Sequence, residues 1–456
     1  MLLTADYIWV NGQARTGYGV DITEDGRIGR VEPWDEKRDV SDLHLKDRLI
    51  IPGLINSHSH VFQRLIRGRT QVSSGSPDSF WTWRTSMYRA AQRLDPETMH
   101  QAAAQAILEM VLSGTTSLGE FHYVHNQSDG TSYQRRGELA HSVAKAAELL
   151  GIRMRLLRVV YHSSGFGSLP EGAQRRFCDR DIFESIDCIE ELRAEFENYN
   201  NIEVGVAAHS IRAMSPRDIC QLKETFPGLP FHIHVSEQPK EVEDCRSHYG
   251  TTPIALLAEN GVLDGWTTLV HGTHATPAEV ELIAQAKSTV CFCPTTEADL
   301  GDGIGPADQY YRQGVPLSLG SDGQTLCNLW EEMRRLESHA RLATGRRSVL
   351  AKAETDSPGV FCFEAATRLA KRAVGFEVGE LQAGHWADLV GLDLTQIELA
   401  GWSPRTLMDS IVFSGAPGMV KEVMVGGRFI VLDGKHPAER DIVKSFQRAS
   451  QIVFVE

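Results

Sequence analysis

The sequence lacks the features that membrane insertion, export or a disulfide framework would require. No stretch approaches about 18 uninterrupted apolar residues, so we expect no membrane span. The first residues, MLLTADYIWVNG, have no basic flank and no long apolar core, so we expect no signal peptide. Cysteine is sparse, with eight residues in 456, which favours a reducing cytoplasm over a disulfide framework.

Basic charge and several common motifs are also scarce. The chain has 46 Lys and Arg against 60 Asp and Glu, a net charge of −14, so we expect neither nucleic acid nor an anionic membrane as a partner. We find no Walker loop, no dinucleotide fingerprint and no nucleophile elbow. Cys291 and Cys293 form a C-x-C pair without a second pair nearby. We expect them to be small buried side chains and not a zinc-thiolate site.

Both ends of the chain have the pattern of β structure. The dipeptides Asn11-Gly12 and Asp25-Gly26 separate short apolar alternations, which is typical of β-hairpins. The segments ADLVGLDL and EVMVGGRFIVLDGK near the other end have the same texture. We therefore expect a small β-sandwich built from residues 1–51 and 376–456, followed by an amphipathic terminal helix after Asp441.

The middle of the chain, residues 52–375, alternates between strand-like and helix-like segments. Helical patterns such as MHQAAAQAILEMVLSG end on glycine stop signals. Between them lie eight apolar runs: RLIIPGLIN, GTTSLGEF, RMRLLRVVY, IEVGVAAHS, PFHIHVSE, TTLVHGTH, STVCFCP and VPLSLGSD. This alternation predicts an α/β fold, a (β/α)₈ TIM-type barrel. Residues 67–87 are predicted to be a long loop, which is usual for lids and binding loops.

Histidine and acidic side chains gather at the ends of the predicted strands, where barrels of this kind place their active sites. His58 and His60 lie one residue apart in INSHSH, so they point the same way. The fifth predicted strand ends with His234 and the eighth with Asp322. Three neutral imidazoles and one carboxylate suit a divalent ion such as Zn²⁺, with a position left for water. We predict one such ion per chain.

Two more groups at strand ends are candidates for proton transfer. Glu237 lies three residues beyond His234, and His271 ends the sixth predicted strand. General acid–base catalysis needs titratable groups of this type within reach of the reacting atoms. We therefore expect Glu237 and His271 to work beside the metal ion, with Asp322 also taking part.

The motifs PGLINSHSH, HVSE, LVHGTH and LGSDG resemble the amidohydrolase superfamily, in its mononuclear deaminase branch. The segments VGELQAGHWADLVGLDL and VKEVMVGGRFIVLDGK resemble the β-sandwich ends of that superfamily, so the resemblance covers nearly the whole chain. The fourth strand run, VGVAAHS, ends without a lysine. Binuclear members typically carry a carbamylated lysine there, so the resemblance implies a single metal ion.

Within this branch the chain most resembles the formimidoylglutamate deiminases. The resemblance is carried by NSHSHVFQRLIRG, SFWTWRTSMYR, GEFHYVH, AAHSIRA and CPTTEADLGDGI. It implies that the amino-acid part of the substrate is bound by Gln63, Arg84, Tyr123, His209 and Arg212. A glutamate derivative carries two carboxylates, and each favours an arginine fork with hydroxyl or amide support.

The implied reaction is the hydrolysis of N-formimino-L-glutamate to N-formyl-L-glutamate and ammonia, in histidine breakdown. His271 and Asp322 would accept the proton of the attacking water, and Glu237 would donate a proton to the departing nitrogen. The implied partner is a small dianionic amino-acid derivative, and the expected form is a cytoplasmic homodimer.

Two other functions are kept open. A deaminase of a purine, pterin or adenosyl nucleoside would share the metal and the proton-transfer groups, but it would need an aromatic slot, which Trp81 and Trp83 could supply. A non-catalytic ligand-binding relative is the other alternative. Such a protein would have no need of Glu237 and His271 together.

Overall fold

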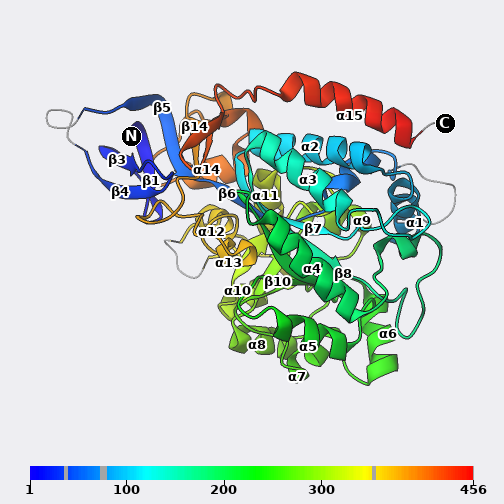
Figure 1. Cartoon of the computed structure of the whole chain (residues 1–456). Coiled ribbons are helices and arrows are strands. Elements are labelled where there is room, and N and C mark those ends of the chain that lie inside the picture. Colours follow the sequence, from blue (N-terminus) through cyan, green and yellow to red (C-terminus); the bar gives the residue numbers. More distant parts are fainter. Residues whose placement is uncertain (35–39, 72–79, 352–355, 455–456) are drawn as a thin grey trace.

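The computed structural model describes residues 1–34, 40–71, 80–351 and 356–454. It contains two large sheets (Figure 1): a mixed sheet from both ends of the chain and a parallel sheet that forms a barrel. The expected fold class, a (β/α)₈ barrel with a β-rich unit from both termini, is confirmed. The domain limits at residues 51 and 375 stay a prediction.

The mixed sheet interleaves strands from the two ends of the chain, in the order β16-β15-β14-β5-β1-β3-β4, with β2 paired to β1. Asn11 and Gly12 both have positive φ, as the turn of a two-residue hairpin requires. The strands are β1 (Leu2–Val10), β2 (Gln13–Arg15), β3 (Tyr18–Ile22), β4 (Ile28–Pro33), β5 (Leu43–Pro52), β14 (Leu389–Asp393), β15 (Val420–Val425) and β16 (Arg428–Val431).

Each of the eight barrel strands runs parallel to the next. The barrel closes where Asp322, just past the last strand, exchanges backbone hydrogen bonds with the first: its N–H donates to His58 O at 3.0 Å, and its O accepts from His60 N at 3.1 Å. The strands are β6 (Leu54–Ser59), β7 (Thr115–His122), β8 (Arg153–Val160), β9 (Ile202–Ser210), β10 (Phe231–Val235), β11 (Thr267–His271), β12 (Thr289–Phe292) and β13 (Leu317–Leu319).

The run RLIIPGLIN, predicted as one strand, is two strands in two different sheets. Strand β5 ends at Pro52 in the mixed sheet, and β6 begins at Leu54 in the barrel. A side chain on Gly53 would lie 2.0 Å from the hydroxyl of Thr116. Only glycine allows the chain to pass so closely over β7 as it changes sheets.

Helices cover the outside of the barrel (Figure 1). Helix α2 (Pro96–Leu112) begins with a capping box in which Asp95 and Thr98 bond each other's backbone N–H, and its predicted position is confirmed. The terminal helix α15 (Glu439–Val453) packs on α2. The others are α1 (Phe80–Ala91), α3 (Glu138–Leu150), α4 (Ile182–Phe196), α5 (Pro216–Thr225), α6 (Pro239–Tyr249), α7 (Pro253–Glu259), α8 (Pro277–Ala286), α9 (Pro294–Leu300), α10 (Ala307–Arg312), α11 (Leu329–Thr344), α12 (Pro358–Ala365), α13 (Lys371–Val374) and α14 (Leu407–Ser414). Short 3₁₀ turns are η1 (Val61–Ile66), η2 (Gly172–Phe177), η3 (Ile397–Leu399) and η4 (Pro417–Met419).

The prediction of a long loop over residues 67–87 is partly wrong. Helix α1 begins at Phe80 and carries the tryptophans of that segment, while residues 72–79 lie outside the described residues. Among the described helices, none has both the length and the apolar character needed to span a membrane.

A buried ion pair ties the barrel to the mixed sheet. Arg153 on β8 donates to both oxygens of Asp388, at 3.0 and 3.1 Å, and its guanidinium stacks on Trp386 at 4.2 Å. The arginine side chain is 2% exposed and the aspartate 0%. Asp388 also accepts from Gly426 N at 2.7 Å. Its carboxylate, just before β14, therefore joins β8 to the turn between β15 and β16.

Replacing Arg153 with Met should lower the free energy of unfolding by about 3–5 kcal/mol, because the buried Asp388 carboxylate loses its partner. Urea unfolding followed by fluorescence measures the change. The control is Arg30→Met, which removes an exposed pair with Glu32 and should cost under about 1 kcal/mol. Equal, small changes in both variants would show that the buried pair does not tie the two sheets together.

Candidate active site

Four side chains bring their donor atoms to one point at the carboxyl end of the barrel. His58 Nε2 lies 3.1 Å from His234 Nε2 and 3.4 Å from Asp322 Oδ1. His60 Nε2 lies 3.1 Å from the same oxygen. All four residues are buried, and their donor atoms lie within 4.8 Å of one another. The four residues expected to bind the metal are thus brought together.

The spacing of these atoms fits a tetrahedral divalent ion. Bonds of about 2.0–2.1 Å to nitrogen and oxygen place neighbouring ligand atoms about 3.3 Å apart in a tetrahedron, and the observed separations are 3.1–3.4 Å. Two of the rings are also oriented correctly. The Nδ1 atoms of His60 and His234 lie 3.0 Å from the carbonyl oxygens of Phe121 and His209, which leaves Nε2 for an ion.

Burial sets the charges of these groups. It lowers the pKa of His58 to about 3 and the pKa of His234 well below its usual value, so both rings are neutral ligands. Burial alone would raise the pKa of Asp322, but hydrogen bonds from His58 and His60 hold it well below the usual value. The result is three histidines beside one ionised carboxylate, the donor set that suits Zn²⁺.

A buried hydrogen-bond network holds the Asp322 loop against the first barrel strand. Asn56 on β6 donates to Ser321 Oγ at 2.7 Å and accepts from Ser321 N at 3.0 Å. Gln324 donates to Ser59 Oγ and to Asp322 O, at 2.8 and 2.9 Å. Asn56 and Ser59, two polar residues of the INSHSH segment, therefore fix the position of the fourth ligand.

Backbone strain also gathers at this end of the barrel. Ser236, His271 and Asp322 have φ values of 51°, 74° and 41°, a region that residues other than glycine rarely adopt. Each follows or ends a strand that supplies the site. Strain of this kind persists where the surrounding structure fixes the residue, and it is common at functional sites.

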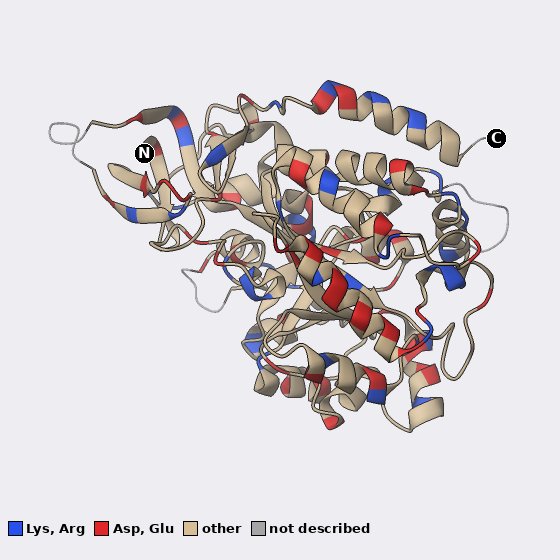
Figure 2. Ribbon diagram, in the orientation of Figure 1, with Lys and Arg blue, Asp and Glu red and all other residues tan. Residues whose placement is uncertain are grey.

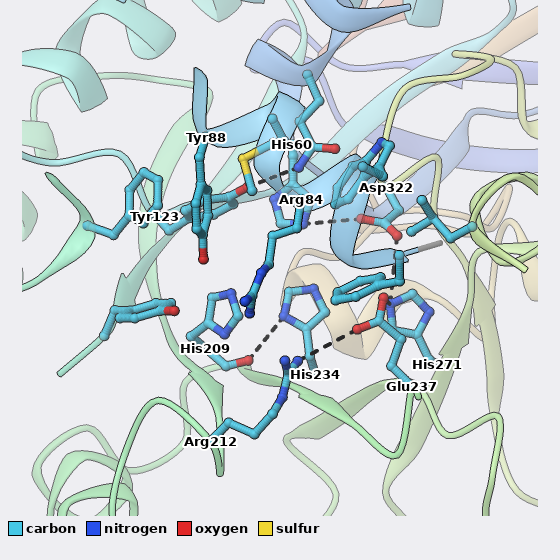
Figure 3. A pocket seen from close by; sticks show the side chains of 17 residues that line it. His60, Arg84, Tyr88, Tyr123, His209, Arg212, His234, Glu237, His271 and Asp322 are labelled. Atoms are coloured by element: carbon cyan, nitrogen blue, oxygen red, sulfur yellow. Dashed lines mark hydrogen bonds and ion pairs between the residues drawn. The ribbon is translucent and has the colours of Figure 1, made fainter. Parts of the chain in front are cut away.

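The candidate acid and base lie beside the metal donors. His271 Nε2 is 3.7 Å from Glu237 Oε1 and 3.7 Å from Asp322 Oδ2. Burial raises the pKa of Glu237, although His271 and Arg212 oppose the shift. Burial alone would lower the pKa of His271, but Glu237 and other nearby carboxylates raise it well above the usual value. A divalent cation bound by Asp322 would oppose that rise and favour the neutral ring. Figure 3 shows both groups on the same side of the pocket as Asp322.

A pocket opens over this cluster. All five residues that the family resemblance assigned to the substrate line it: Gln63, Arg84, Tyr123, His209 and Arg212. Gln63 donates to the hydroxyl of Tyr123 at 2.9 Å. Burial lowers the pKa of His209 well below its usual value, so this ring is neutral. The mixture of aromatic walls with a few polar groups is typical of small-molecule sites.

The two arginines reach the pocket from separate elements. Arg84 projects from α1, and Arg212 follows β9; in Figure 3 they enter from opposite sides. Arg84 lies over the ring of Trp81 at 4.5 Å. Arg212 lies 3.7 Å from Glu237 and 3.9 Å from Glu241. Trp81 therefore holds the guanidinium of Arg84, and Glu237 and Glu241 hold that of Arg212, at the wall of the cavity.

Several pocket residues were not predicted from the sequence. Gln174 donates to the hydroxyls of Tyr88 and Tyr161, at 3.2 Å each, and both tyrosines line the pocket. Tyr161 directly follows β8, so its position at the end of a predicted barrel strand could have identified it as a pocket residue. The remaining unpredicted lining residues are Phe80, Met87, Phe177 and Leu300.

The pair Cys291 and Cys293 is fully buried in a small apolar cluster with Val270. Cys293 Sγ also lies within 4.8 Å of donor atoms on His271 and Asp322. This second group shares Asp322 with the first and adds a single thiol, whose pKa burial raises well above its usual value. The group with three imidazoles is the better divalent-ion site.

Comparisons with known proteins agree with this geometry. Formimidoylglutamate deiminase from Pseudomonas aeruginosa is 38% identical over 428 residues, 93% of this chain and 93% of that protein. A 5-methylthioadenosine/S-adenosylhomocysteine deaminase from Moorella thermoacetica is 27% identical over 430 residues, 92% and 91% of the two chains. The crystal structure of an amidohydrolase from Brucella melitensis superposes with a TM-score of 0.93 at 32% identity, covering 99% of both chains.

A zinc-bound adenosine deaminase from Xanthomonas campestris shares the fold, with a TM-score of 0.84 at 21% identity over 99% and 98% of the two chains. The family model described as the amidohydrolase family matches residues 49–430, from the last strand before the barrel to the last strand of the mixed sheet. This chain therefore belongs to the amidohydrolase family.

Proposed function

We propose that the protein hydrolyses N-formimino-L-glutamate to N-formyl-L-glutamate and ammonia, as a step in histidine breakdown. One observation carries the proposal: a single pocket has the metal donors with Glu237 and His271 at one end and two arginines, Arg84 and Arg212, on its walls. The 38% identity to a formimidoylglutamate deiminase supports the same reaction.

The arginines suit a substrate with two carboxylates. The chain carries a net charge of −14, and acidic side chains are prominent on outer helices such as α4 (Figure 2). A dianion would therefore be repelled at long range unless the pocket supplied positive charge. Arg84 and Arg212, with the hydroxyls of Tyr88 and Tyr161 nearby, provide that charge and further donors for carboxylate oxygens.

The proposed metal ion is one Zn²⁺ per chain, held by His58, His60, His234 and Asp322. When bound, the ion supplies a water of lowered pKa as the nucleophile. His271 and Asp322, 3.7 Å apart, are placed to take the proton of that water. Glu237, whose pKa burial raises, donates a proton to the nitrogen, so that it leaves as ammonia. The homodimer and the cytoplasmic location stay predictions.

Deamination of an aromatic ring is the second candidate function. Trp83 lines the pocket, but Trp81 lies under the guanidinium of Arg84 and is not among the described lining residues. A ring substrate would use the aromatic wall and would give Arg84 and Arg212 no carboxylate of the substrate to bind. A purely ligand-binding role is disfavoured, because it gives no purpose to Glu237 and His271 beside the metal donors.

An ammonia-release assay separates these functions. The purified, metal-loaded enzyme is given formimino-glutamate beside a panel of purines, pterins and adenosyl nucleosides. Rapid release from formimino-glutamate alone is expected. Faster release from a ring substrate would replace the proposal with the ring-deaminase function, and no release from any substrate would favour the binding relative.

Metal analysis of the purified enzyme should give one divalent ion per chain. Removal of the ion by a chelator should abolish ammonia release, and one equivalent of Zn²⁺ should restore it, because the four donors form one site. Cys293→Ser should keep the full metal content, whereas His234→Ala should lose it. Two tightly bound ions per chain would contradict the single-site prediction.

Glu237→Gln should lower kcat by about 10²–10⁴, the usual contribution of a general acid or base, with unchanged metal content. Glu237 contacts His271 and Arg212 and is not one of the four converging donors. Glu243→Gln, on the exposed face of α6, is the matched control and should be fully active. Loss of the metal in Glu237→Gln would identify this residue as a ligand instead.

Arg84→Met and Arg212→Met should each weaken kcat/KM for formimino-glutamate by about 2–5 kcal/mol, the scale for removing one partner of a buried charge pair. Lysine at either position should rescue only in part, because the bidentate fork is lost. Arg89→Met is the control, since this arginine lies on the exposed side of α1. Near-normal kcat/KM in both methionine variants would contradict the dianion-binding role.

A further inference from the structure

A buried carboxylate next to His271 has no part in the mechanism described so far. Glu297 lies in the first turn of α9 and is 2% exposed. Its Oε1 accepts from the backbone N–H of Cys293 at 2.9 Å and lies 3.3 Å from His271 Nδ1. Glu297 is not among the described residues that line the pocket, so it can act on the reaction only through His271.

The contact fixes which nitrogen of His271 carries a proton. Glu297 Oε1 already accepts from Cys293 N–H, and a carboxylate oxygen in that role also accepts from His271, so the proton shared with Glu297 belongs to Nδ1. The other nitrogen, Nε2, faces the reacting side, 3.7 Å from both Glu237 and Asp322. In the neutral ring this arrangement leaves the lone pair of Nε2 free to accept a proton from water.

The strained backbone of His271 is a second reason why a neighbouring group must hold this residue in place. Its φ of 74° places a branched, bulky residue in the left-handed region, where the conformation persists only if neighbouring groups fix it. Glu297 is itself held by the chain segment between β12 and α9. The ring of His271 is therefore fixed against an element that does not belong to its own strand.

We propose that Glu297 is a positioning residue, which holds His271 with the proton on Nδ1 and the lone pair of Nε2 toward the substrate. The proposal rests on the role of His271 given under the proposed function, but not on the identity of the substrate. It adds a carboxylate–histidine pair behind the metal centre.

Glu297→Leu tests the orientation because it removes the acceptor with little change in size. Leucine accepts no hydrogen bond, so nothing holds the proton on Nδ1. Glu297→Gln should be milder, because its amide oxygen can stay at the position of Oε1, where it accepts both from Cys293 N–H and from Nδ1. We expect kcat to fall by about 10²–10⁴ in the leucine variant, with KM and metal content close to wild type.

Glu332→Leu is the matched control. Glu332 is a fully buried carboxylate that bonds the same end of α9, through Thr295 N at 2.9 Å and the Thr295 hydroxyl, and no contact to His271 is seen among the described residues. Both leucine substitutions remove a buried carboxylate at one helix start. Only Glu297→Leu should lower kcat strongly, and an equal loss in both would reduce Glu297 to a structural role.

The decisive measurement is the ¹⁵N NMR spectrum of metal-loaded enzyme with labelled histidine, with His271 assigned by its loss in a His271→Asn variant. In the wild type and in Glu297→Gln, Nδ1 should be protonated and Nε2 unprotonated, whereas Glu297→Leu should lose the fixed proton on Nδ1. If the leucine variant does not fold, the glutamine variant should still keep the proton on Nδ1. An unprotonated Nδ1 or a protonated Nε2 in the wild type, or an unchanged ring in Glu297→Leu, would overturn the proposal.

The spectrum needs no substrate. Failure to release ammonia from formimino-glutamate would count against the proposed function, while the position of the His271 proton would still decide the role of Glu297.

Discussion

The site depends on the closure of the barrel between its first strand and the segment after its last. Two backbone hydrogen bonds join Asp322 to His58 and His60, although 262 residues separate His60 from Asp322 in the chain. This pairing places the only carboxylate of the donor set against two of its imidazoles. The buried network of Asn56, Ser321 and Gln324 then fixes the loop. Without closure, the four donors would not share a centre.

The same end of the barrel holds groups of opposite charge in an ordered way. Carboxylates of Asp322, Glu237 and Glu297 surround His271, while Arg84 and Arg212 stand on the walls of the pocket (Figure 3). Under the proposed function, a dianionic substrate would be directed with its carboxylates toward the arginines and its reacting carbon toward the metal donors. The acidic exterior makes this local positive charge the main source of attraction.

The fold and the metal donors could be predicted because they follow short-range patterns. Strand runs of the right length and a two-residue spacing of His58 and His60 determine where those side chains point. The (β/α)₈ alternation then brings distant strand ends together. The exception is the run RLIIPGLIN. Its apolar residues follow one another without a break, although the chain passes from one sheet to the other at Gly53. The hydrophobic pattern alone therefore could not show that the run forms two strands.

Other features depend on packing that sequence patterns do not specify. Tyr88 lies on helix α1, just past the segment predicted to be a loop, and Gln174 joins its hydroxyl to that of Tyr161. Glu297 reaches His271 across a strand–helix junction. A lone Gln or Glu in a helix is usually a solvated side chain, so these contacts become visible only when the barrel is closed and the loops are in place.

The central claim is that one metal ion and two arginines fix the two ends of one substrate. Anomalous X-ray diffraction at the zinc edge, from crystals soaked with a glutamate derivative that cannot be hydrolysed, tests it most directly. The account predicts one anomalous peak between the Nε2 atoms of His58, His60 and His234, with the carboxylates of the ligand at Arg84 and Arg212. A peak elsewhere, or a ligand whose carboxylates point away from both arginines, would contradict it.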